Sequence, residues 1–462
     1  MAQNALQVEA VVLAAGQGTR MRSKRHKVLH HLGGIPMLHH VLHRAEALGA
    51  RAIHVVIGHQ AEAIKAATPR ELDWVLQTEQ LGTGHAVQQV MPHVQDDSVV
   101  LVLFGDVPMV SQQLLADCVD AAGSDALALV TADFDDPTGL GRIVRDAAGN
   151  VLEIVEHKDA DESQRAIREI NSGIMALPGA LLRRLLEELM AQPPQNNQGE
   201  YYLTTLIEYA VRDGVPVHPI KAKRPQEVMG VNTRNQLAEL ERDLQRQRAE
   251  QLMADGVTLA DPARLDVRGE LTTGIDVFID VNVVFEGTVS LGSNVCIGPG
   301  CVITDSVIGD GTQIFPNTVM ESAEIGAGCN VGPFARLRPG TKLRDKVKIG
   351  NFVETKNAEL GDNSKASHLT YLGDTTVGED CNIGAGTVTC NYDGINKHRT
   401  DIGDGVFVGT NSTLVAPIKL GDDSFVAAGS TLTGDLADED LGVGRGKQRN
   451  IKGWTRPDRR GK

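Results

Sequence analysis

The C-terminal half of the chain repeats an aliphatic residue, followed by glycine or a small or polar residue, every six positions between Ile279 and Leu432. Clear examples are Leu291-Gly292, Ile297-Gly298, Ile325-Gly326, Ile349-Gly350 and Val408-Gly409. A six-residue period fits neither the 3.6-residue period of a helix nor the strict alternation of a half-buried strand. Repeats this short predict a parallel β-solenoid.

A second position of the hexad is restricted as well. The fourth residue after the aliphatic one is small, as expected where a corner of a narrow coil leaves little room, at Val295, Cys301, Val307, Thr312, Thr318, Cys329, Ala335, Thr341, Val347, Val353, Ser364, Thr370, Thr376, Cys381, Thr387, Val406, Ser412, Ser424 and Ser430. The repeat resembles the hexapeptide left-handed β-helix, a prism of short strands with about 18 residues per coil. The expected handedness comes from this resemblance, and many members of that family are acyltransferases.

The N-terminal half instead alternates apolar, β-rich runs with helical patterns. We expect buried strands at 9–15, 52–57, 73–77, 98–104 and 126–131, and helices at 37–48, 84–91 and 111–121. This alternation predicts a Rossmann-like, doubly wound α/β sheet whose ligand crevice lies at the carboxyl ends of the strands.

Residues 234–255 are rich in Glu, Gln, Arg and Leu and contain neither proline nor β-branched residues. They predict a single connecting helix closed by Gly256. The expected organisation is therefore an α/β domain over residues 1–233, this linker helix, a β-helix over residues 256–447 and a basic tail over residues 448–462.

The net charge of −15 opposes general binding to nucleic acids or anionic membranes. No apolar run approaches the roughly 20 residues of a membrane span, so we expect none, and we expect the protein in the cytoplasm. Only the C-terminal end is basic, and this fits either a solvated, partly disordered tail or a local contact with phosphate. Its cations, set against Asp458 alone, are Arg445, Lys447, Arg449, Lys452, Arg456, Arg459, Arg460 and Lys462.

The first predicted strand runs into a loop suited to phosphate binding. Its sequence is Leu13-Ala14-Ala15-Gly16-Gln17-Gly18-Thr19-Arg20-Met21, with Lys27 shortly after. Small residues let backbone amides approach phosphates, and Arg20 and Lys27 add positive charge for a triphosphate. The loop matches neither the GxGxxG fingerprint of dinucleotide-binding folds nor a Walker loop.

The string LAAGQGTRM with its following lysine resembles the nucleotide-sugar pyrophosphorylases. Together with the hexapeptide half, the resemblance covers nearly the whole chain, and it is to the bacterial bifunctional N-acetylglucosamine-1-phosphate uridyltransferases and glucosamine-1-phosphate acetyltransferases. It implies acetyl transfer from acetyl-CoA to glucosamine-1-phosphate, and then uridylyl transfer from UTP to N-acetylglucosamine-1-phosphate with release of pyrophosphate. The product, UDP-N-acetylglucosamine, supplies cell-envelope polysaccharides.

Uridylyl transfer asks a protein mainly to align groups and neutralise charge with Mg²⁺ and cationic side chains, and we expect Arg20 and Lys27 to be catalytic in this sense. Gly105-Asp106 follows the buried strand 98–104 at its carboxyl end. The resemblance, with Gly230-Val231-Asn232, makes Asp106 and Asn232 the expected Mg²⁺ ligands. Two oxygen donors suit a hard cation that keeps most of its waters.

The resemblance assigns the other uridyltransferase contacts to the phosphate loop, a turn that reads uracil, the end of strand 98–104 and three sugar-binding positions. These residues are Leu13, Ala14, Ala15 and Gly16 in the loop, Gln77, Gly82 and Thr83 in the turn, Phe104 and Gly105 at the strand end, and Gly141, Glu156 and Asn171 at the sugar. Phe104 stands where the family has a tyrosine, so any contact made by that hydroxyl is missing.

Acetyl transfer to an amine needs a base for the nucleophile, a donor near the thioester oxygen and a groove for coenzyme A. His368 lies between two slips of the six-residue phase, and histidine titrates near neutral pH. Its segment KASHLTYLGD resembles KAGHLTYLGD of the family, which makes His368 the expected catalytic base. A polar insertion at residues 390–401 interrupts the hexads and predicts a loop that reaches over the site.

The resemblance also assigns the acetyltransferase contacts. These residues are Arg338 and Lys356 at the sugar phosphate, Tyr371 and Asn382 at the sugar, Asn391 and Tyr392 near the thioester of acetyl-CoA, and Ala385, Thr410, Ala428 and Arg445 along coenzyme A. Thr410 replaces the serine of the family but keeps a hydroxyl. The family forms homotrimers through the β-helix with the acetyl site between subunits, and we expect the same here.

Two alternatives use the same two modules. One is a single-activity sugar nucleotidyltransferase with a regulatory β-helix, as in ADP-glucose pyrophosphorylases, and His368 with the 390–401 loop argues against it. The other is a non-enzymatic scaffold, as in exchange subunits of eukaryotic translation initiation. Arg20, Lys27 and Asp106 argue against the scaffold.

Overall fold

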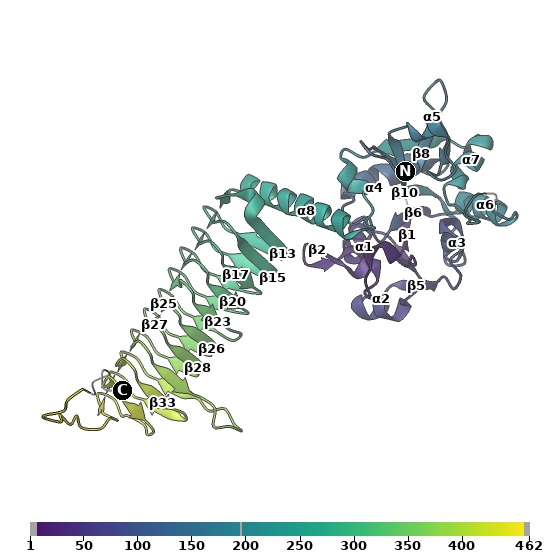
Figure 1. Cartoon of the computed structure of the whole chain (residues 1–462). Coiled ribbons are helices and arrows are strands. Elements are labelled where there is room, and N and C mark those ends of the chain that lie inside the picture. The colour runs from purple at the N-terminus through teal and green to yellow at the C-terminus, as the bar shows by residue number, and fades with distance from the viewer. Residues whose placement is uncertain (1–6, 195, 457–462) are drawn as a thin grey trace, which may run out of the picture. The chain divides into compact units, whose positions relative to one another are not determined.

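The computed structural model describes residues 7–194 and 196–456 and divides the chain into two compact units, Met1–Leu244 and Gln245–Lys462 (Figure 1). Each unit is described separately. The end of the basic tail, residues 457–462, lies outside the described residues. Among the helices of the described residues, none combines the length and the apolar character needed to cross a membrane.

The first unit is built on one sheet of nine strands. Five of them confirm the strands predicted from the sequence: β1 (Val8–Leu13), β4 (Ala52–Ile57), β5 (Asp73–Leu76), β6 (Val99–Phe104) and β7 (Leu127–Asp133). β1 pairs in parallel with both β4 and β6, so the carboxyl ends of these three strands share one edge of the sheet.

One long strand that the hydrophobic pattern did not single out lies in the middle of this sheet. β10 (Glu169–Pro178) separates β6 from β7 and is antiparallel to both. β11 (Val217–Lys221) extends the far edge beside β7, and the hairpin β8 (Arg142–Arg145) and β9 (Val151–Val155) attaches to β10. The predicted doubly wound sheet is therefore confirmed as a mixed sheet.

Helices cover both faces of the sheet, because successive residues of a strand point to opposite sides. Ala10 and Val12 of β1 join one hydrophobic cluster, and Val11 between them joins the other. The first cluster also contains residues of α1 (Met37–Ala47), α2 (Ala61–Ala67) and α4 (Gln112–Ala122), and the second contains residues of α3 (Thr83–Gln88), α6 (Gly179–Met190) and α7 (Thr205–Arg212). Both faces are therefore buried, as a doubly wound sheet requires.

A buried histidine links three strands of this sheet. His54 on β4 hydrogen-bonds Asp73 through Nδ1 (2.9 Å) and Glu9 through Nε2 (3.2 Å). His54 is 1% exposed and Glu9 is 2% exposed, so the Glu9 carboxylate has little access to water. Its interaction with the imidazole therefore offsets the cost of burying it.

The second unit confirms the β-solenoid. Its strands, from β12 (Thr258–Leu259) to β37 (Leu441–Gly442), pair in parallel with the coil before and the coil after (Figure 1). Ile297 pairs with Ile314 and then with Val331 through successive strands, so each coil aligns its apolar position with the next. The linker helix α8 (Arg234–Ala254) begins in the first unit and ends in the second, and Gln245, in its middle, exchanges two hydrogen bonds with the backbone of Val267, at 2.9 and 2.8 Å.

Both restricted hexad positions face the interior, with two exceptions. The aliphatic residues form one continuous buried cluster along the unit, and most of the small residues are buried with them. Val307 is 53% exposed and Thr376 is half-buried, so the prediction that they point inward is wrong. Ser306 and Thr375 are buried instead, because the chain reaches the corner one residue earlier in those coils.

The coils turn at corners where the backbone adopts a left-handed conformation. At one corner the N–H of the turning residue donates to a carbonyl of the preceding coil, as Lys346 does to Ala327 (2.8 Å) and Asp380 to Asp362 (2.8 Å). Glycine, asparagine and aspartate tolerate this conformation best. The residues at this corner are Asn294, Gly311, Gly328, Lys346, Asn363, Asp380, Gly405 and Asp423.

The His54 contacts generate a stability prediction. His54→Ala should lower the free energy of unfolding of the first unit by about 3 kcal/mol, because it leaves the Glu9 carboxylate buried without its partner. Denaturant unfolding followed by the fluorescence of Trp74, in a Trp454→Phe background, measures the change. His218→Ala truncates an exposed histidine of β11 and should change the value by less than about 0.5 kcal/mol. Equal losses in the two variants would contradict the prediction.

Candidate active sites

The loops that follow β1 and β6 emerge side by side, because Leu13 and Phe104 are paired at the ends of these parallel strands. Together with the turn after β5 they enclose a cleft of about 230 Å³, hereafter the nucleotide cleft. The cleft is lined by Leu13, Ala14, Ala15, Gly16, Lys27, Val28, Gln77, Gln80, Gly82, Thr83, Ala86, Phe104, Asp106 and Glu200. Most of the residues predicted to contact the nucleotide are therefore brought together.

A side-chain hydrogen bond and a close backbone contact fix the shape of the predicted uracil-reading turn. Gln77 is buried and donates from Nε2 to the carbonyl of Gly82 (3.2 Å). Gly82 has a φ of 112° and lies against the backbone of Tyr201, where an added Cβ would come 2.5 Å from the Tyr201 carbonyl oxygen. Only glycine fits this combination of conformation and close approach.

Three residues predicted for the nucleotide and its metal, Gly105, Arg20 and Asn232, are absent from the described lining of the cleft. Gly105 lies beneath it and donates its N–H to the carbonyl of Leu13 (2.9 Å), which joins the two strand ends. Arg20 is exposed in the short 3₁₀ helix η1 (Thr19–Met21). Its predicted contact with a triphosphate stays a prediction.

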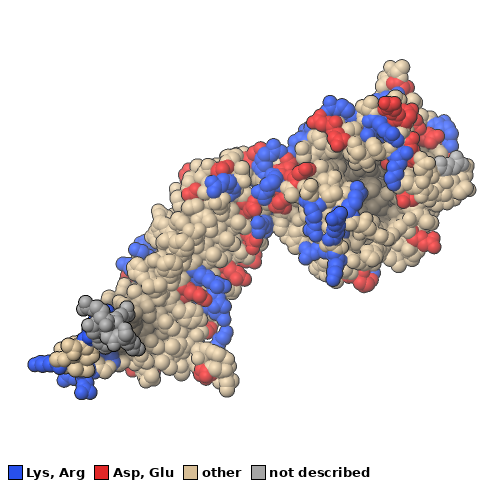
Figure 2. Space-filling model, viewed as in Figure 1, with Lys and Arg blue, Asp and Glu red and all other residues tan. Residues whose placement is uncertain are grey.

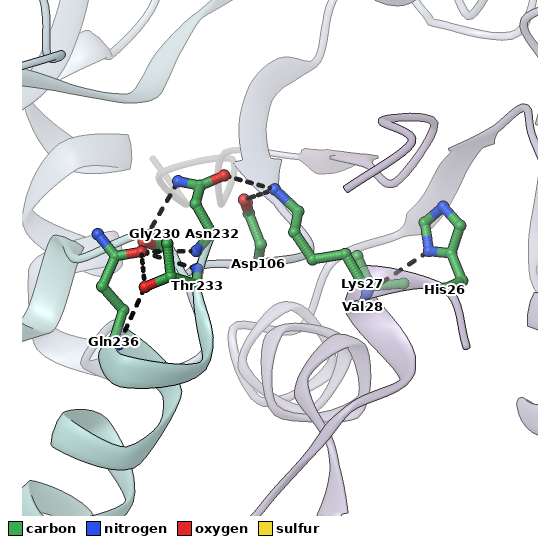
Figure 3. Close-up of polar contacts among 8 residues, drawn as sticks. All are labelled: His26, Lys27, Val28, Asp106, Gly230, Asn232, Thr233 and Gln236. Carbon is green, nitrogen blue, oxygen red and sulfur yellow. Dashed lines mark hydrogen bonds and ion pairs between the residues drawn. The ribbon is translucent and has the colours of Figure 1, made fainter. Parts of the chain in front are cut away.

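The two predicted metal ligands meet at the ammonium group of Lys27 (Figure 3). Lys27 Nζ donates to Asp106 Oδ2, in a short ion pair, and to Asn232 Oδ1 at 3.0 Å. Asp106 and Lys27 are 79 residues apart in the chain, and Asn232 is 205 residues from Lys27. A carboxylate oxygen and an amide oxygen that converge on one cation are the donor types that Mg²⁺ prefers.

Asn232 is positioned by the start of α8. Gln236 Oε1 accepts hydrogen bonds from the N–H groups of Asn232 (2.9 Å) and Thr233 (3.0 Å) (Figure 3). Thr233 Oγ1 in turn accepts from the N–H of Gln236 (3.3 Å). This reciprocal pair is a capping box, which satisfies amides that the first helical turn leaves free. The same box therefore orders the turn that carries Asn232, the predicted metal ligand.

The predicted sugar-binding residues also lie together. The N–H of Asn171 donates to the carbonyl of Gly141 (2.9 Å), and Glu156 Oε1 accepts from Thr204 Oγ1 (3.2 Å). Burial raises the pKa of the Glu156 carboxyl above its usual value. Glu156 lines a cleft that shares Glu200 with the nucleotide cleft.

In the second unit, His368 ends β27 (Lys365–His368) and pairs with Asn351, the last residue of β25 (Lys348–Asn351). The two side chains are hydrogen-bonded, with His368 Nδ1 2.8 Å from Asn351 Oδ1. Because the amide oxygen only accepts, this bond requires a proton on Nδ1 and leaves Nε2 as the basic nitrogen of the neutral ring. Asn351 therefore selects the tautomer that a general base needs.

Four predicted residues follow one another at the same corner of successive coils. Gly386, the residue after Ala385, donates its N–H to the carbonyl of His368 one coil earlier (3.2 Å). Asn411, the residue after Thr410, donates its N–H to the carbonyl of Ala385 in the same way (2.7 Å). The corner continues to Ala428, whose carbonyl accepts from Arg445 Nη1 (2.7 Å). We call the set His368, Ala385, Thr410 and Ala428 the His368 column.

A cluster of cations lies where the sugar phosphate is predicted. Lys397 lowers the pKa of the Lys356 ammonium, chiefly through their close contact, and Arg338 adds to the effect. Arg338 Nη1 donates to Glu354 Oε1 (2.9 Å). Burial acts to raise the pKa of the nearby Asp374 carboxyl, but hydrogen bonds from two asparagines and the charges of Lys397 and Lys356 lower it overall. Like charges held this close suit an anionic ligand.

The remaining acetyltransferase residues are spread around this cluster. Tyr371 and Asn391 both lie over Gly373, where an added Cβ would collide with the tyrosine hydroxyl. Tyr392 lies in the 390–401 loop, is exposed, and donates its hydroxyl to the carbonyl of Gly394 (2.6 Å). Asn382 is half-buried on β29 (Asn382–Ile383) and pairs with Lys365 of the preceding coil. Its predicted sugar contact stays a prediction.

Comparison with known proteins decides the family. The MobA-like NTP transferase domain matches residues 10–257, and the hexapeptide repeat of succinyl-transferase matches residues 399–434. The chain is 55% identical to the bifunctional protein GlmU of Marinobacter nauticus, over 97% of this chain and 99% of that protein. It is 54% identical to GlmU of Stutzerimonas stutzeri, over 98% and 100%, and 51% identical to GlmU of Pseudoalteromonas atlantica, over 97% and 98%.

The chain belongs to the GlmU family. Membership confirms the enzyme predicted from the sequence, a uridyltransferase and acetyltransferase of UDP-N-acetylglucosamine synthesis, and implies UTP and acetyl-CoA as co-substrates. It excludes both the non-enzymatic scaffold and the single-activity nucleotidyltransferase.

Three residues that bear on the candidate sites were not predicted from the sequence. Lys397 lies in the predicted loop beside Lys356 and was not among the predicted site residues, because nothing in the hexad pattern indicates where a loop side chain points. Asn351 carries no motif, and its contact with His368 follows from strand register. Gln236 did have a signal, since threonine followed three residues later by glutamine at a helix start predicts a capping box.

The environment of His26 predicts how acid affects the first unit. Burial, with the charge of Lys27, lowers the pKa of His26 to about 4. As the pH falls from about 6.5 to about 4, the unfolded chain gains a proton that the folded chain does not, so the free energy of unfolding should fall by about 3 kcal/mol. Below that pKa both states are protonated and the loss ends. His26→Asn, which keeps a side-chain acceptor, should lose less stability over this range.

Unfolding curves from pH 7 to pH 4, followed by Trp74 fluorescence in the Trp454→Phe background, measure this difference. His218→Asn removes an exposed histidine and serves as the control. Parallel stability curves for the wild type and His26→Asn would show that His26 does not cause the acid sensitivity.

The Asn351 contact predicts a change in the pH dependence of acetyl transfer. Asn351→Ala should slow turnover about 10-fold with little change in KM for acetyl-CoA, because Nδ1 loses its acceptor and the tautomer is no longer selected. Asn351→Asp keeps an acceptor, and its negative charge favours the protonated ring. The acidic limb of its pH-rate profile should therefore move to higher pH. Thiol release across a pH series measures both effects, and unchanged profiles would contradict the role of Asn351.

Proposed function

We propose that the nucleotide cleft carries the uridyltransferase site and that the His368 column, with its neighbouring cations, carries the acetyltransferase site. The convergence of Lys27, Asp106 and Asn232 at the mouth of two parallel strands is the observation that carries the first assignment. On this proposal residues 1–233 carry the uridyltransferase activity and residues 256–447 carry the acetyltransferase activity. Residues 234–255 form the linker between them.

In the first site, Asp106 and Asn232 would hold Mg²⁺ through their side-chain oxygens. When bound, Mg²⁺ supplies positive charge to the phosphates of UTP. Lys27 and Arg20 would balance the charge that develops as the sugar phosphate oxygen attacks the α-phosphorus and pyrophosphate leaves. Within residues 7–194 and 196–456 no group of three or more His, Cys, Asp or Glu side chains is arranged to hold a metal. Two protein ligands with water and phosphate oxygens suit Mg²⁺ better than a transition metal.

The other contacts of this site orient the two substrates. Gln77, Gly82 and Thr83 would hold the uracil, and the backbone from Leu13 to Gly16 would approach the phosphates. The sugar would lie against Gly141, Glu156 and Asn171, and Glu200 connects their cleft with the nucleotide cleft. The packing of Phe104 against Gly173, where an added Cβ would come 2.5 Å from the ring, favours a structural role for this ring.

In the second site, Nε2 of His368 would accept a proton from the amine of glucosamine-1-phosphate as its nitrogen attacks the thioester carbonyl. The carbon–sulfur bond breaks, and the coenzyme A thiolate leaves and takes up a proton. Arg338, Lys356 and Lys397 would hold the sugar phosphate, with Tyr371 at the sugar. Asn382 would also contact the sugar, Asn391 and Tyr392 would lie near the thioester, and Ala385, Thr410, Ala428 and Arg445 would lie along coenzyme A.

We further propose a cytoplasmic homotrimer assembled through the β-helix. The visible face of this unit has broad areas without charged side chains (Figure 2), and Phe334 and Phe352 are exposed and stacked with ring centroids 5.6 Å apart. Apolar surface of this kind favours contact with a further copy. Figure 2 also places Lys and Arg side chains at the C-terminal end of the chain, in agreement with a basic tail that contacts coenzyme A.

One assay with two variants tests both assignments. Purified protein is given glucosamine-1-phosphate, acetyl-CoA, UTP and Mg²⁺, and the release of thiol and of pyrophosphate is followed separately. His368→Ala should lower thiol release at least about 100-fold, and should leave pyrophosphate release from N-acetylglucosamine-1-phosphate and UTP intact. Asp106→Ala should do the reverse. Thiol release at the wild-type rate in His368→Ala, or pyrophosphate release at that rate in Asp106→Ala, would refute the corresponding site.

A further inference from the structure

The ammonium group of Lys27 and the proposed Mg²⁺ compete for the same two oxygen atoms. Lys27 Nζ contacts Asp106 Oδ2 and Asn232 Oδ1, and Figure 3 shows the lysine side chain reaching toward both residues. Lys27 is 13% exposed and Asp106 is 16% exposed at their side chains, so the contact is largely shielded from water. An ion pair shielded in this way is a strong one.

We propose that Lys27 acts as a resident cation that occupies the metal position of the nucleotide cleft until a divalent cation displaces it. The inference rests on the proposed function, because it takes Asp106 and Asn232 as the metal ligands. Metal binding and the departure of Lys27 from these oxygens are then a single exchange.

The charges at the site allow one cation but not two. Asp106 supplies one negative charge, and the amide of Asn232 supplies only a dipole. Among the described residues, no group of three or more acidic, histidine or cysteine side chains is arranged to hold a metal. An ammonium and a divalent cation in contact with the same carboxylate oxygen would repel each other strongly.

The fold keeps the two oxygens in place while the lysine side chain can leave. Asp106 is held by its backbone carbonyl, which accepts from the N–H of Val231 (2.9 Å), and Asn232 is held by Gln236. The backbone of Lys27 is fixed in the 3₁₀ helix η2 (Lys27–Leu29), where its carbonyl accepts from the N–H of His30 (3.2 Å). The exchange therefore needs rotation of one flexible side chain and no backbone movement.

This arrangement couples the metal to the nucleotide. Lys27 also lines the nucleotide cleft, so phosphates bound there offer its ammonium a second anionic partner. A nucleotide that draws Lys27 away frees Asp106 and Asn232 for the metal, and a bound metal frees Lys27 for the phosphates. Each ligand then increases the affinity for the other by the same factor.

Direct binding of Mn²⁺ to the full-length protein without nucleotide tests the exchange. Free Mn²⁺ is measured by electron paramagnetic resonance, so the result does not depend on activity. Lys27→Met keeps most of the side-chain length but removes the charge, and it should bind Mn²⁺ about 10-fold more tightly than the wild type. Lys24→Met removes the same charge from an exposed residue three positions earlier and should change the affinity less than about 2-fold. Thermal unfolding checks that both variants fold.

The outcomes separate this proposal from the metal site itself. Equal or weaker Mn²⁺ binding in Lys27→Met, or an equal gain in Lys24→Met, overturns the exchange. The double variant Lys27→Met/Asp106→Ala should lose the tight binding. If it keeps that binding, the cation does not use Asp106 and the proposed metal site is wrong. If it loses all Mn²⁺ binding while Lys27→Met alone gains none, the metal site stands and only the exchange fails.

Discussion

Parallel pairing of strands is the constraint on which both candidate sites depend. Strands that run in the same direction end at the same edge, so the segments that follow them emerge together. In the first unit this brings the phosphate loop after β1 beside Asp106 after β6. In the second unit it stacks each corner on the corner before, which aligns Asn351 with His368 and continues the column toward Ala428. Strand residues that take no part in the reactions therefore decide where the candidate site residues lie.

Both candidate sites hold cationic side chains that already contact other side chains of the protein. Lys27 contacts Asp106 and Asn232 in the nucleotide cleft, and Arg338 contacts Glu354 on the β-helix. Lys356 and Lys397 are held close enough to lower the pKa of Lys356. Internal carboxylates therefore balance some of these cations. A cation that already has a partner must exchange it when the substrate binds, which ties the binding of one ligand to the position of another.

The periodic and local features of the fold were predictable. Five strands of the sheet and the linker helix follow from runs of residues whose pattern is complete within a short stretch. β10 was not predicted, because nothing in the sequence of this strand shows that it pairs antiparallel with β6 and β7. The prediction that Val307 and Thr376 point inward was wrong, because a strict six-residue count cannot show that a coil turns one residue early. Phase is the property that a simple repeat predicts least well.

The sequence by itself determined the β-helix, the α/β sheet and the segments that contain the candidate site residues. The reason is that the hexads, the strand runs and the phosphate loop each consist of residues that are neighbours in the sequence. Only the tertiary structure decided which of those residues meet. The contact of Lys27 with Asn232 joins residues 205 positions apart, and Asn351 reaches His368 only through the register of two coils. Such contacts depend on the packing of the whole unit, which no local pattern encodes.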